Sequence, residues 1–163
     1  MKQNCKVLQP KPETMKHILL IFALLLALTS CENDDLPQSD VQFSLVGKGD
    51  SFPNDKSVAQ RHLIIKDTVS WNNLINEMDA SNNLTKDLKE ISIDFSKFQI
   101  IAIIDKTQNN GGHSIDVVEM SENRNTIIVK VEKLKDGNLT PKLSRPYDIV
   151  KMPKTTKKIV FEQ

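Results

Sequence analysis

Apolar and polar residues alternate along several short segments of the chain, and this pattern predicts strands. A period of two, bounded by Gly, Asn, Asp or Pro, is typical of half-buried strands. The segments of this kind are 41–46, 61–66, 91–95, 113–120, 126–131, 147–151 and 158–161. The segment 98–104 is nearly all apolar, which predicts a central strand covered on both faces.

One segment has the period of a helix instead. Trp71, Leu74, Ile75 and Met78 recur at i, i+3, i+4 and i+7, and Ser70 precedes them as a predicted cap. Their side chains are expected to bury one helix face on a sheet. The predicted class is therefore α+β, with a mainly antiparallel sheet of about six to eight short strands and one principal helix packed on it.

Two polar segments between the strands predict tight turns. Residues 109–112 and 135–138 combine Asn, Asp and Gly, which adopt positive φ at low cost. A third polar segment, 122–125, separates two alternating strands, so these strands are expected to form a hairpin.

The N-terminal part has the pattern of an export signal. A short positive segment begins at Met15, and the eleven apolar residues 18–28 follow. That run covers about half of the ~30 Å that a membrane-spanning helix needs, and it matches the apolar part of a secretory signal. Leu28-Thr29-Ser30-Cys31 resembles the lipobox of bacterial lipoproteins, which implies cleavage before Cys31 and lipidation of its side chain. The alternative is a buried apolar helix that ends in an incidental cysteine.

We therefore expect three parts. Residues 1–30 are a signal peptide, translated from Met15 rather than Met1; residues 31–40 hold the lipidated cysteine and a flexible linker; residues 41–163 form the folded domain. Cys5 would then be absent from the protein, and the domain would contain neither disulfides nor cysteine-ligated zinc. Acidic residues after Cys31 resemble the signal that sends some bacterial lipoproteins to the outer face, although they also suit a solvated linker. The expected location is the cell envelope, as an outer-membrane lipoprotein facing either the surface or the periplasm.

Charge argues against nucleic acid as a partner. The chain of 163 residues has a formal net charge of +1, but residues 1–30 hold four lysines and one glutamate. Subtracting them leaves 18 basic and 20 acidic residues. A strongly cationic nucleic-acid binder is therefore disfavoured. The basic residues do concentrate in 141–158. One interpretation is a basic surface that contacts lipid headgroups or an acidic partner, and the other is a solvated strand face.

Several spaced motifs occur within residues 41–161. They are Trp71 with Leu74, the segment Ile93-Asp94-Phe95-Ser96-Lys97, the segment Gly111-Gly112-His113-Ser114-Ile115, and the segment Arg145-Pro146-Tyr147-Asp148-Ile149-Val150 with Pro153. Together they resemble the C-terminal domain of PrcB-type proteins. The resemblance implies a small lipoprotein domain related to a subunit that stabilises a secreted surface protease complex. His113 departs from the pattern, because a tyrosine is expected after the paired glycines.

The histidines and serines form no recognisable catalytic motif. His62 and His113 lie in no metal-ligand spacing, and no serine lies in a GxSxG motif. His113, Ser114 and Asp116 are close in sequence, but Ser114 is predicted to point away from the other two because strand neighbours face opposite sides. We therefore expect a protein that is not an enzyme and that has no metal and no cofactor.

The expected function is that of a lipid-anchored accessory or protein-binding module. Its partners would be membrane lipid, through acylated Cys31, and an envelope protein, which the resemblance suggests is a protease. The candidate partner-binding residues are Trp71, Tyr147, Lys151 and Lys154. Trp71 is also explained as a plug between helix and sheet, and Tyr147 as the start of a strand. The alternative function is binding of a small molecule or glycan in the envelope.

Overall fold

The architecture is known from a computed structural model, which describes residues 39–54 and 59–163. The predicted signal peptide, Cys31 and the linker up to Gln38 lie outside the described residues. The elements are strands β1 (Ser39–Asp40), β2 (Ser44–Gly49) and β3 (Arg61–Ile65), helix α2 (Thr68–Asn82), a 3-10 turn (Leu84–Asp87), and strands β4 (Phe98–Ile104), β5 (Asp116–Glu122), β6 (Thr126–Glu132), β7 (Tyr147–Pro153) and β8 (Lys158–Glu162). In the described part, no helix is long and apolar enough to cross a membrane.

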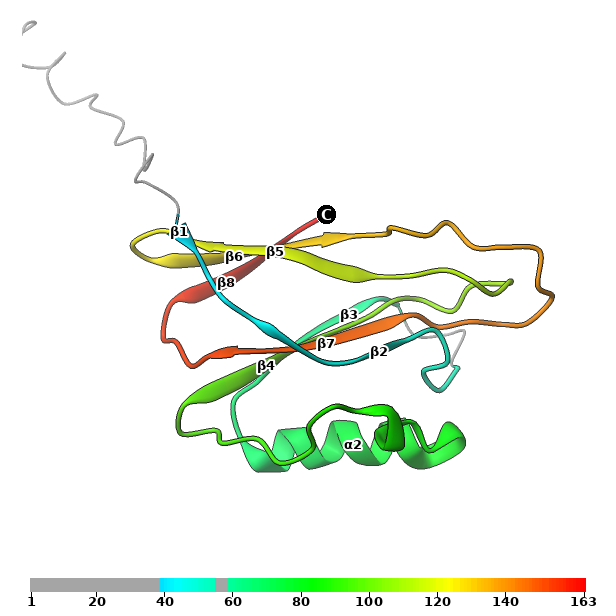
Figure 1. Ribbon diagram of the computed structural model, residues 1–163, viewed down its shortest axis with the longest axis horizontal. Helices are drawn as coiled ribbons and strands as arrows, with labels where there is room; N and C mark the ends of the chain where they lie inside the picture. Colours follow the sequence, from blue (N-terminus) through cyan, green and yellow to red (C-terminus); the bar gives the residue numbers. More distant parts are fainter. Residues whose placement is uncertain (1–38, 55–58) are drawn as a thin grey trace, which may run out of the picture. The chain divides into compact units, whose positions relative to one another are not determined.

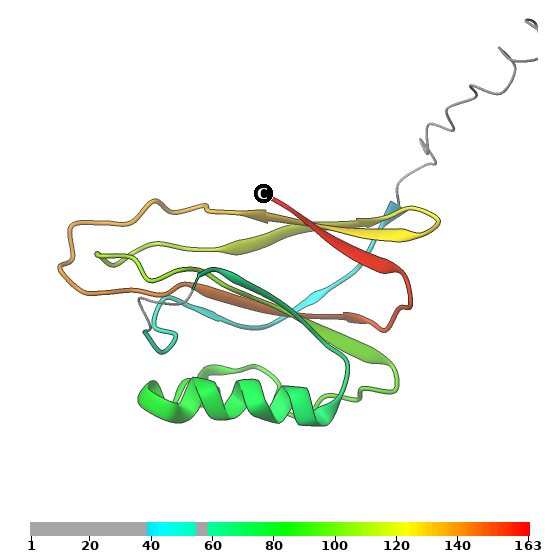
Figure 2. The same ribbon diagram turned by 180° about the vertical axis from the view of Figure 1, so that it is seen from behind.

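Eight strands form two four-stranded sheets, and helix α2 covers the outer face of one of them (Figure 1). The first sheet has the order β1-β5-β6-β8, and the second has the order β2-β7-β4-β3. The view from behind shows the same three layers: first sheet, second sheet, helix (Figure 2). The α+β class is thus confirmed, but the strands are divided between two sheets rather than placed in one.

The prediction of mainly antiparallel pairing is wrong for the first sheet, which is mixed. Strand β8 pairs with β6 in parallel, with Thr126 opposite Lys158 and Lys130 opposite Glu162. The reason is the path of the chain, because β7 belongs to the second sheet and runs back along the sandwich between β6 and β8. When the chain crosses to the first sheet after β7, it therefore runs in the same direction as β6.

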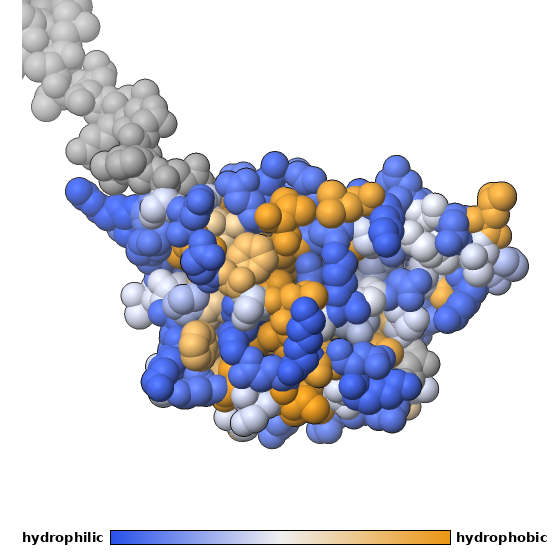
Figure 3. All heavy atoms as spheres, in the orientation of Figure 1, coloured by the Kyte–Doolittle hydropathy of each residue, from blue (hydrophilic) through white to orange (hydrophobic). Residues whose placement is uncertain are grey.

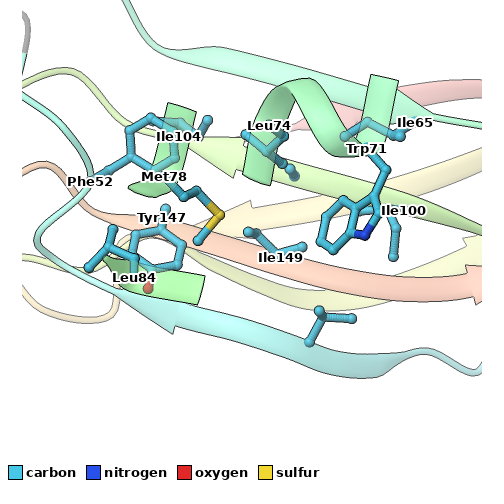
Figure 4. Close-up of a cluster of buried hydrophobic side chains, with 12 residues drawn as sticks. Phe52, Ile65, Trp71, Leu74, Met78, Leu84, Ile100, Ile104, Tyr147 and Ile149 are labelled. Carbon is cyan, nitrogen blue, oxygen red and sulfur yellow. The ribbon is translucent and has the colours of Figure 1, made fainter. Parts of the chain in front are cut away.

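Strand β4 separates two apolar cores, as its apolar run predicted. Ile100, Ala102 and Ile104 face helix α2, whereas Ile101 and Ile103 face the first sheet. All five side chains are fully buried, since a strand between two apolar layers has no solvent face. Figure 4 shows the helix-side core, in which Trp71 lies at one end and Phe52, Leu84 and Tyr147 lie together at the other.

Two local predictions are corrected by the structure. Helix α2 is capped by Asp67 rather than Ser70: the Asp67 carboxylate accepts hydrogen bonds from the Ser70 backbone N–H at 2.8 Å and from the Ser70 hydroxyl at 2.9 Å. Residues 91–95 form no strand. Asp94 instead closes a turn, because its carboxylate accepts from the Ser96 N–H and its carbonyl accepts from the Phe98 N–H.

The sandwich has two distinct ends. We call the loop end the one that carries the connections 105–115 and 133–146. The opposite end carries the turns 123–125 and 154–157, together with β1, where the described chain begins (Figure 1). Ser39 pairs with Glu122 there, so the described chain enters the domain at the end away from the long loops.

Candidate functional site

The two turns that the sequence predicted at 109–112 and 135–138 lie against each other at the loop end. The backbone N–H of Asn138 donates to the carbonyl of Gly111 at 2.8 Å, and the N–H of Gly111 donates to the carbonyl of Thr140 at 3.1 Å. Gln108 and Ser144 exchange two further backbone hydrogen bonds, of 2.7 and 3.2 Å. The two connections therefore form one ordered structure beyond the sheets.

Glycines allow this close approach. Gly112 and Gly137 have backbone φ values of 78° and 97°, which residues with a side chain rarely adopt. A Cβ at Gly137 would lie 2.4 Å from Nε2 of His113, and a Cβ at Gly112 would lie 2.5 Å from Nδ2 of Asn138. The His113 ring thus packs against Gly137, and its Nε2 makes a 2.9 Å hydrogen bond with Oδ1 of Asn110.

A buried arginine ties the loop end to the second sheet. Nε of Arg145 donates to the carbonyl of Asp105 at 3.1 Å, and Nη1 donates to the carbonyl of Pro53 at 2.8 Å. The guanidinium lies over the ring of Phe52, 5.3 Å from its centroid. The buried Asp105 carboxylate in turn accepts from Nζ of Lys133 at 2.9 Å. Arg145 therefore joins three separate segments of the chain.

A second buried carboxylate, that of Asp116, holds the connections to the first sheet. It accepts from the Ser114 hydroxyl at 2.6 Å and from the Leu134 N–H at 3.2 Å, and it forms an ion pair with Lys48. The prediction that Ser114 points away from Asp116 is wrong, because residues two apart lie on the same side of an extended chain. The Ser114 hydroxyl also accepts from the Lys135 N–H at 3.0 Å, so its hydrogen bonds are used to hold the loop.

Asp148 links the two sheets at the same end. Its side chain is buried, and Oδ2 accepts a 2.8 Å hydrogen bond from the backbone N–H of Val117 in β5. Burial raises the pKa of this carboxyl above its ordinary value, while the Val117 N–H and nearby Lys48 act in the opposite direction.

A cleft of about 380 Å3 lies at the loop end. It is lined by Lys48, Gly49, Asp50, Gly112, His113, Ser114 and Lys135. Two lysines and an imidazole line it together with one carboxylate, that of Asp50, and Lys48 is already paired with Asp116, so the lining suits a polar group with some preference for negative charge. Among residues 39–54 and 59–163, no group of three His, Cys, Asp or Glu side chains could hold a metal ion.

The two aromatic candidates from the sequence lie in the helix-side core (Figure 4). Trp71 is 2% exposed and its Nε1 donates to the carbonyl of Ile91 at 2.8 Å. Tyr147 is also 2% exposed, and its ring meets that of Phe52 edge-on with 5.8 Å between centroids. Burial raises the pKa of Tyr147. In this conformation neither ring offers a surface to a partner.

The two lysine candidates lie away from the cleft. Lys151 forms an ion pair with Glu90 and lies over the ring of Phe98, 4.9 Å from its centroid. Lys154 donates to the carbonyl of Phe95 at 2.6 Å. Because β7 runs the length of the sandwich, the basic residues of 141–158 do not form one surface. Lys142 lies at the loop end, whereas Lys154, Lys157 and Lys158 lie at or next to the turn at the opposite end.

Sequence reasoning did not identify the buried polar side chains of the loop end or its exposed leucines. Leu134 is 61% exposed and Leu139 is 100% exposed. The available signal was Leu139 itself, a large apolar residue directly after the polar segment 135–138 that predicted a turn.

A model of the family described as PrcB C-terminal matches residues 100–153. This confirms the resemblance seen in the sequence for the segment that holds strands β4 to β7 and both loop-end connections. The match is shorter than residues 41–161, and helix α2 with Trp71 lies outside it. No curated protein and no solved structure matches the chain.

Proposed function

We propose that this protein is an accessory module of the bacterial envelope that binds, and helps to stabilise, another envelope protein. The observation that carries the proposal is the match of residues 100–153 to the PrcB C-terminal family, which suggests association with a protease complex. The matched segment contains both loop-end connections, which are joined by backbone and side-chain hydrogen bonds. Their hydrogen bonds hold a fixed surface, which suits recognition of a folded partner.

Attachment to the membrane through acylated Cys31 is part of this proposal. The order of positive residues, an apolar run, small residues and cysteine supports it. Each buried methylene contributes ~0.8 kcal/mol, and stable anchoring takes more than one chain. A diacylated cysteine would therefore keep the domain on the envelope, beside a surface or periplasmic partner.

The test is cross-linking in intact cells followed by purification of the membrane form. We expect one dominant envelope protein to be recovered with the wild-type chain, and a Cys31→Ser variant to leave the lipid fraction and lose that partner. Recovery of a monomer with no cross-linked protein would refute the binding function. Retention of the variant in the lipid fraction would refute the anchor alone.

The cleft at the loop end supports a second candidate, a binder of an anionic small molecule or glycan. Lys48, Lys135 and His113 line there a volume that suits a small ligand. Within the described part of the chain, Lys135 is the one of the three whose side chain makes no ion pair or hydrogen bond with another side chain. Calorimetric titration with phosphorylated and uronic sugars would test it. Binding by the wild type that is lost in Lys135→Ala would support this function, and no heat across the panel would contradict it.

A further inference from the structure

Leu134 and Leu139 give the loop end an unusual surface. Both belong to the connection 133–146, and they are the two large apolar side chains of that connection that face solvent. Figure 3 shows apolar atoms projecting among hydrophilic ones at the end of the domain where the loops lie. Singly exposed apolar side chains are common on protein surfaces, but two on one connection, one of them 100% exposed, offer apolar area that a partner can bury.

The loop that carries these leucines is held in place on both sides. The N–H of Leu134 donates to the buried Asp116 carboxylate at 3.2 Å. Next to Leu139, the N–H of Thr140 donates to Oδ1 of Asn138 at 2.9 Å, and the Thr140 carbonyl accepts from Gly111. The leucines are thus presented by an ordered backbone, which lowers the entropy lost on binding.

The charges around the leucines are mostly positive. Lys106, Lys135 and Lys142 are exposed on the two connections, and Asp136 is the exposed acid among their described residues. The other acid, Asp105, is buried and paired with Lys133. A surface with this pattern is complementary to an apolar pocket with an acidic rim.

The attachment point of the chain favours a protein over the membrane as occupant. Seven residues, 32–38, separate the predicted lipid anchor Cys31 from Ser39, and they span at most about 25 Å. Ser39 lies at the end of the sandwich opposite to the leucines. Strands of seven residues, ~23 Å long, separate the two ends. A domain tethered at this end can stand with its loop end away from its own membrane, within reach of a protein partner.

We propose that Leu134 and Leu139 anchor the loop end in an apolar pocket, rimmed by carboxylates, of the envelope protein that the module binds. This inference rests on the proposed function and adds the surface and the chemistry of the partner. The lysines steer the encounter and the leucines supply the buried contact.

The experiment places a photo-crosslinking amino acid at position 139 of the full-length, membrane-bound protein in its native envelope. Val69, which is 71% exposed on helix α2, is the matched control position. We expect one protein adduct from position 139, reduced about tenfold by Leu134→Asp and by the double change Lys135→Glu and Lys142→Glu, with no such adduct from position 69. The cross-linked peptide of the partner should lie beside carboxylates.

Other outcomes would overturn the inference. They are an adduct with lipid, an adduct of twice the chain mass, an adduct insensitive to Leu134→Asp, or no adduct at position 139. An adduct at position 69 without one at position 139 would overturn the inference but leave the proposed function standing. No protein adduct at any exposed position would refute both. Leu134→Asp, at a side chain that is 61% exposed, should leave the urea unfolding midpoint unchanged, which separates loss of binding from loss of folding.

Discussion

Replacing Arg145 by methionine tests the claim that this side chain braces the loop end. Methionine fills much of the same volume but donates no hydrogen bond, so the carbonyls of Asp105 and Pro53 lose their buried donor. Hydrogen bonds to a charged group contribute about 1.5–3 kcal/mol each, and the contact with the Phe52 ring adds about 1 kcal/mol. The variant no longer buries a charged guanidinium, and this gain offsets part of the lost interactions. The free energy of unfolding is therefore expected to fall by about 4 kcal/mol.

A loss of that size is a large share of the ~5–15 kcal/mol that stabilises a typical domain. Trp71, the only tryptophan of the chain, is buried and reports unfolding by its fluorescence. With a urea dependence of about 2 kcal/mol per molar, the midpoint should fall by about 2 M. Arg145→Lys keeps one donor and the charge, so about half of that shift is expected. Lys142→Met, an exposed change in the same connection, is the control and should shift the midpoint very little. The bracing role would be refuted by a midpoint for Arg145→Met within about 0.5 M of the wild type.

Three other changes test separate parts of the structure. Trp71→Phe removes the hydrogen bond to the Ile91 carbonyl and part of a buried ring, so the free energy of unfolding should fall by about 2–3 kcal/mol. Unfolding of this variant is followed by circular dichroism, and a loss below about 0.5 kcal/mol would contradict the packing described. Gly112→Ala should lower the free energy of unfolding by about 1–3 kcal/mol, because residue 112 has a positive φ and Asn138 lies close to it. The control Gly111→Ala would meet only ordinary contacts and should cost less than about 1 kcal/mol. Equal costs for the two variants would contradict the claimed strain. Burial raises the pKa of Asp148 in the folded state, so the stability linked to its protonation is present at low pH and is lost as the pH rises through the folded pKa. Asp148→Asn cannot ionise, and its urea midpoint relative to the wild type should therefore rise between pH 4 and pH 7; a difference that does not change with pH would show that the carboxyl is not desolvated.

The elements were predictable from the sequence where apolar spacing has one explanation. Residues 98–104 can be apolar throughout because layers cover both faces of β4, and Trp71, Leu74 and Met78 repeat because one helix face is buried. Residues 91–95 have the alternation of a strand, yet they form none: the Ile91 carbonyl accepts a hydrogen bond from Trp71 of helix α2, and Asp94 closes a turn. The apolar and polar pattern of residues 91–95 alone does not predict a contact with Trp71, 20 residues away.

The site was less predictable because it is built from long-range pairs. The sequence placed turns at 109–112 and 135–138, but their contact depends on the chain passing from the first sheet to the second between β6 and β7. Arg145 looked like part of a basic tail, and its burial follows from acceptors 40 and 92 residues away. The parallel pairing of β8 likewise depends on the return path of β7, which no local spacing encodes.

The position of β8 determines when the first sheet can be completed. Strand β6 acquires its second neighbour only when residues 158–162 are available, some thirty residues after it was synthesised. On the export route proposed above, a chain that emerges N-terminus first would hold an unfinished sheet edge until β8 had passed through the channel. Its final fold would then be reached only after translocation, on the side of the membrane where the proposed partner is met.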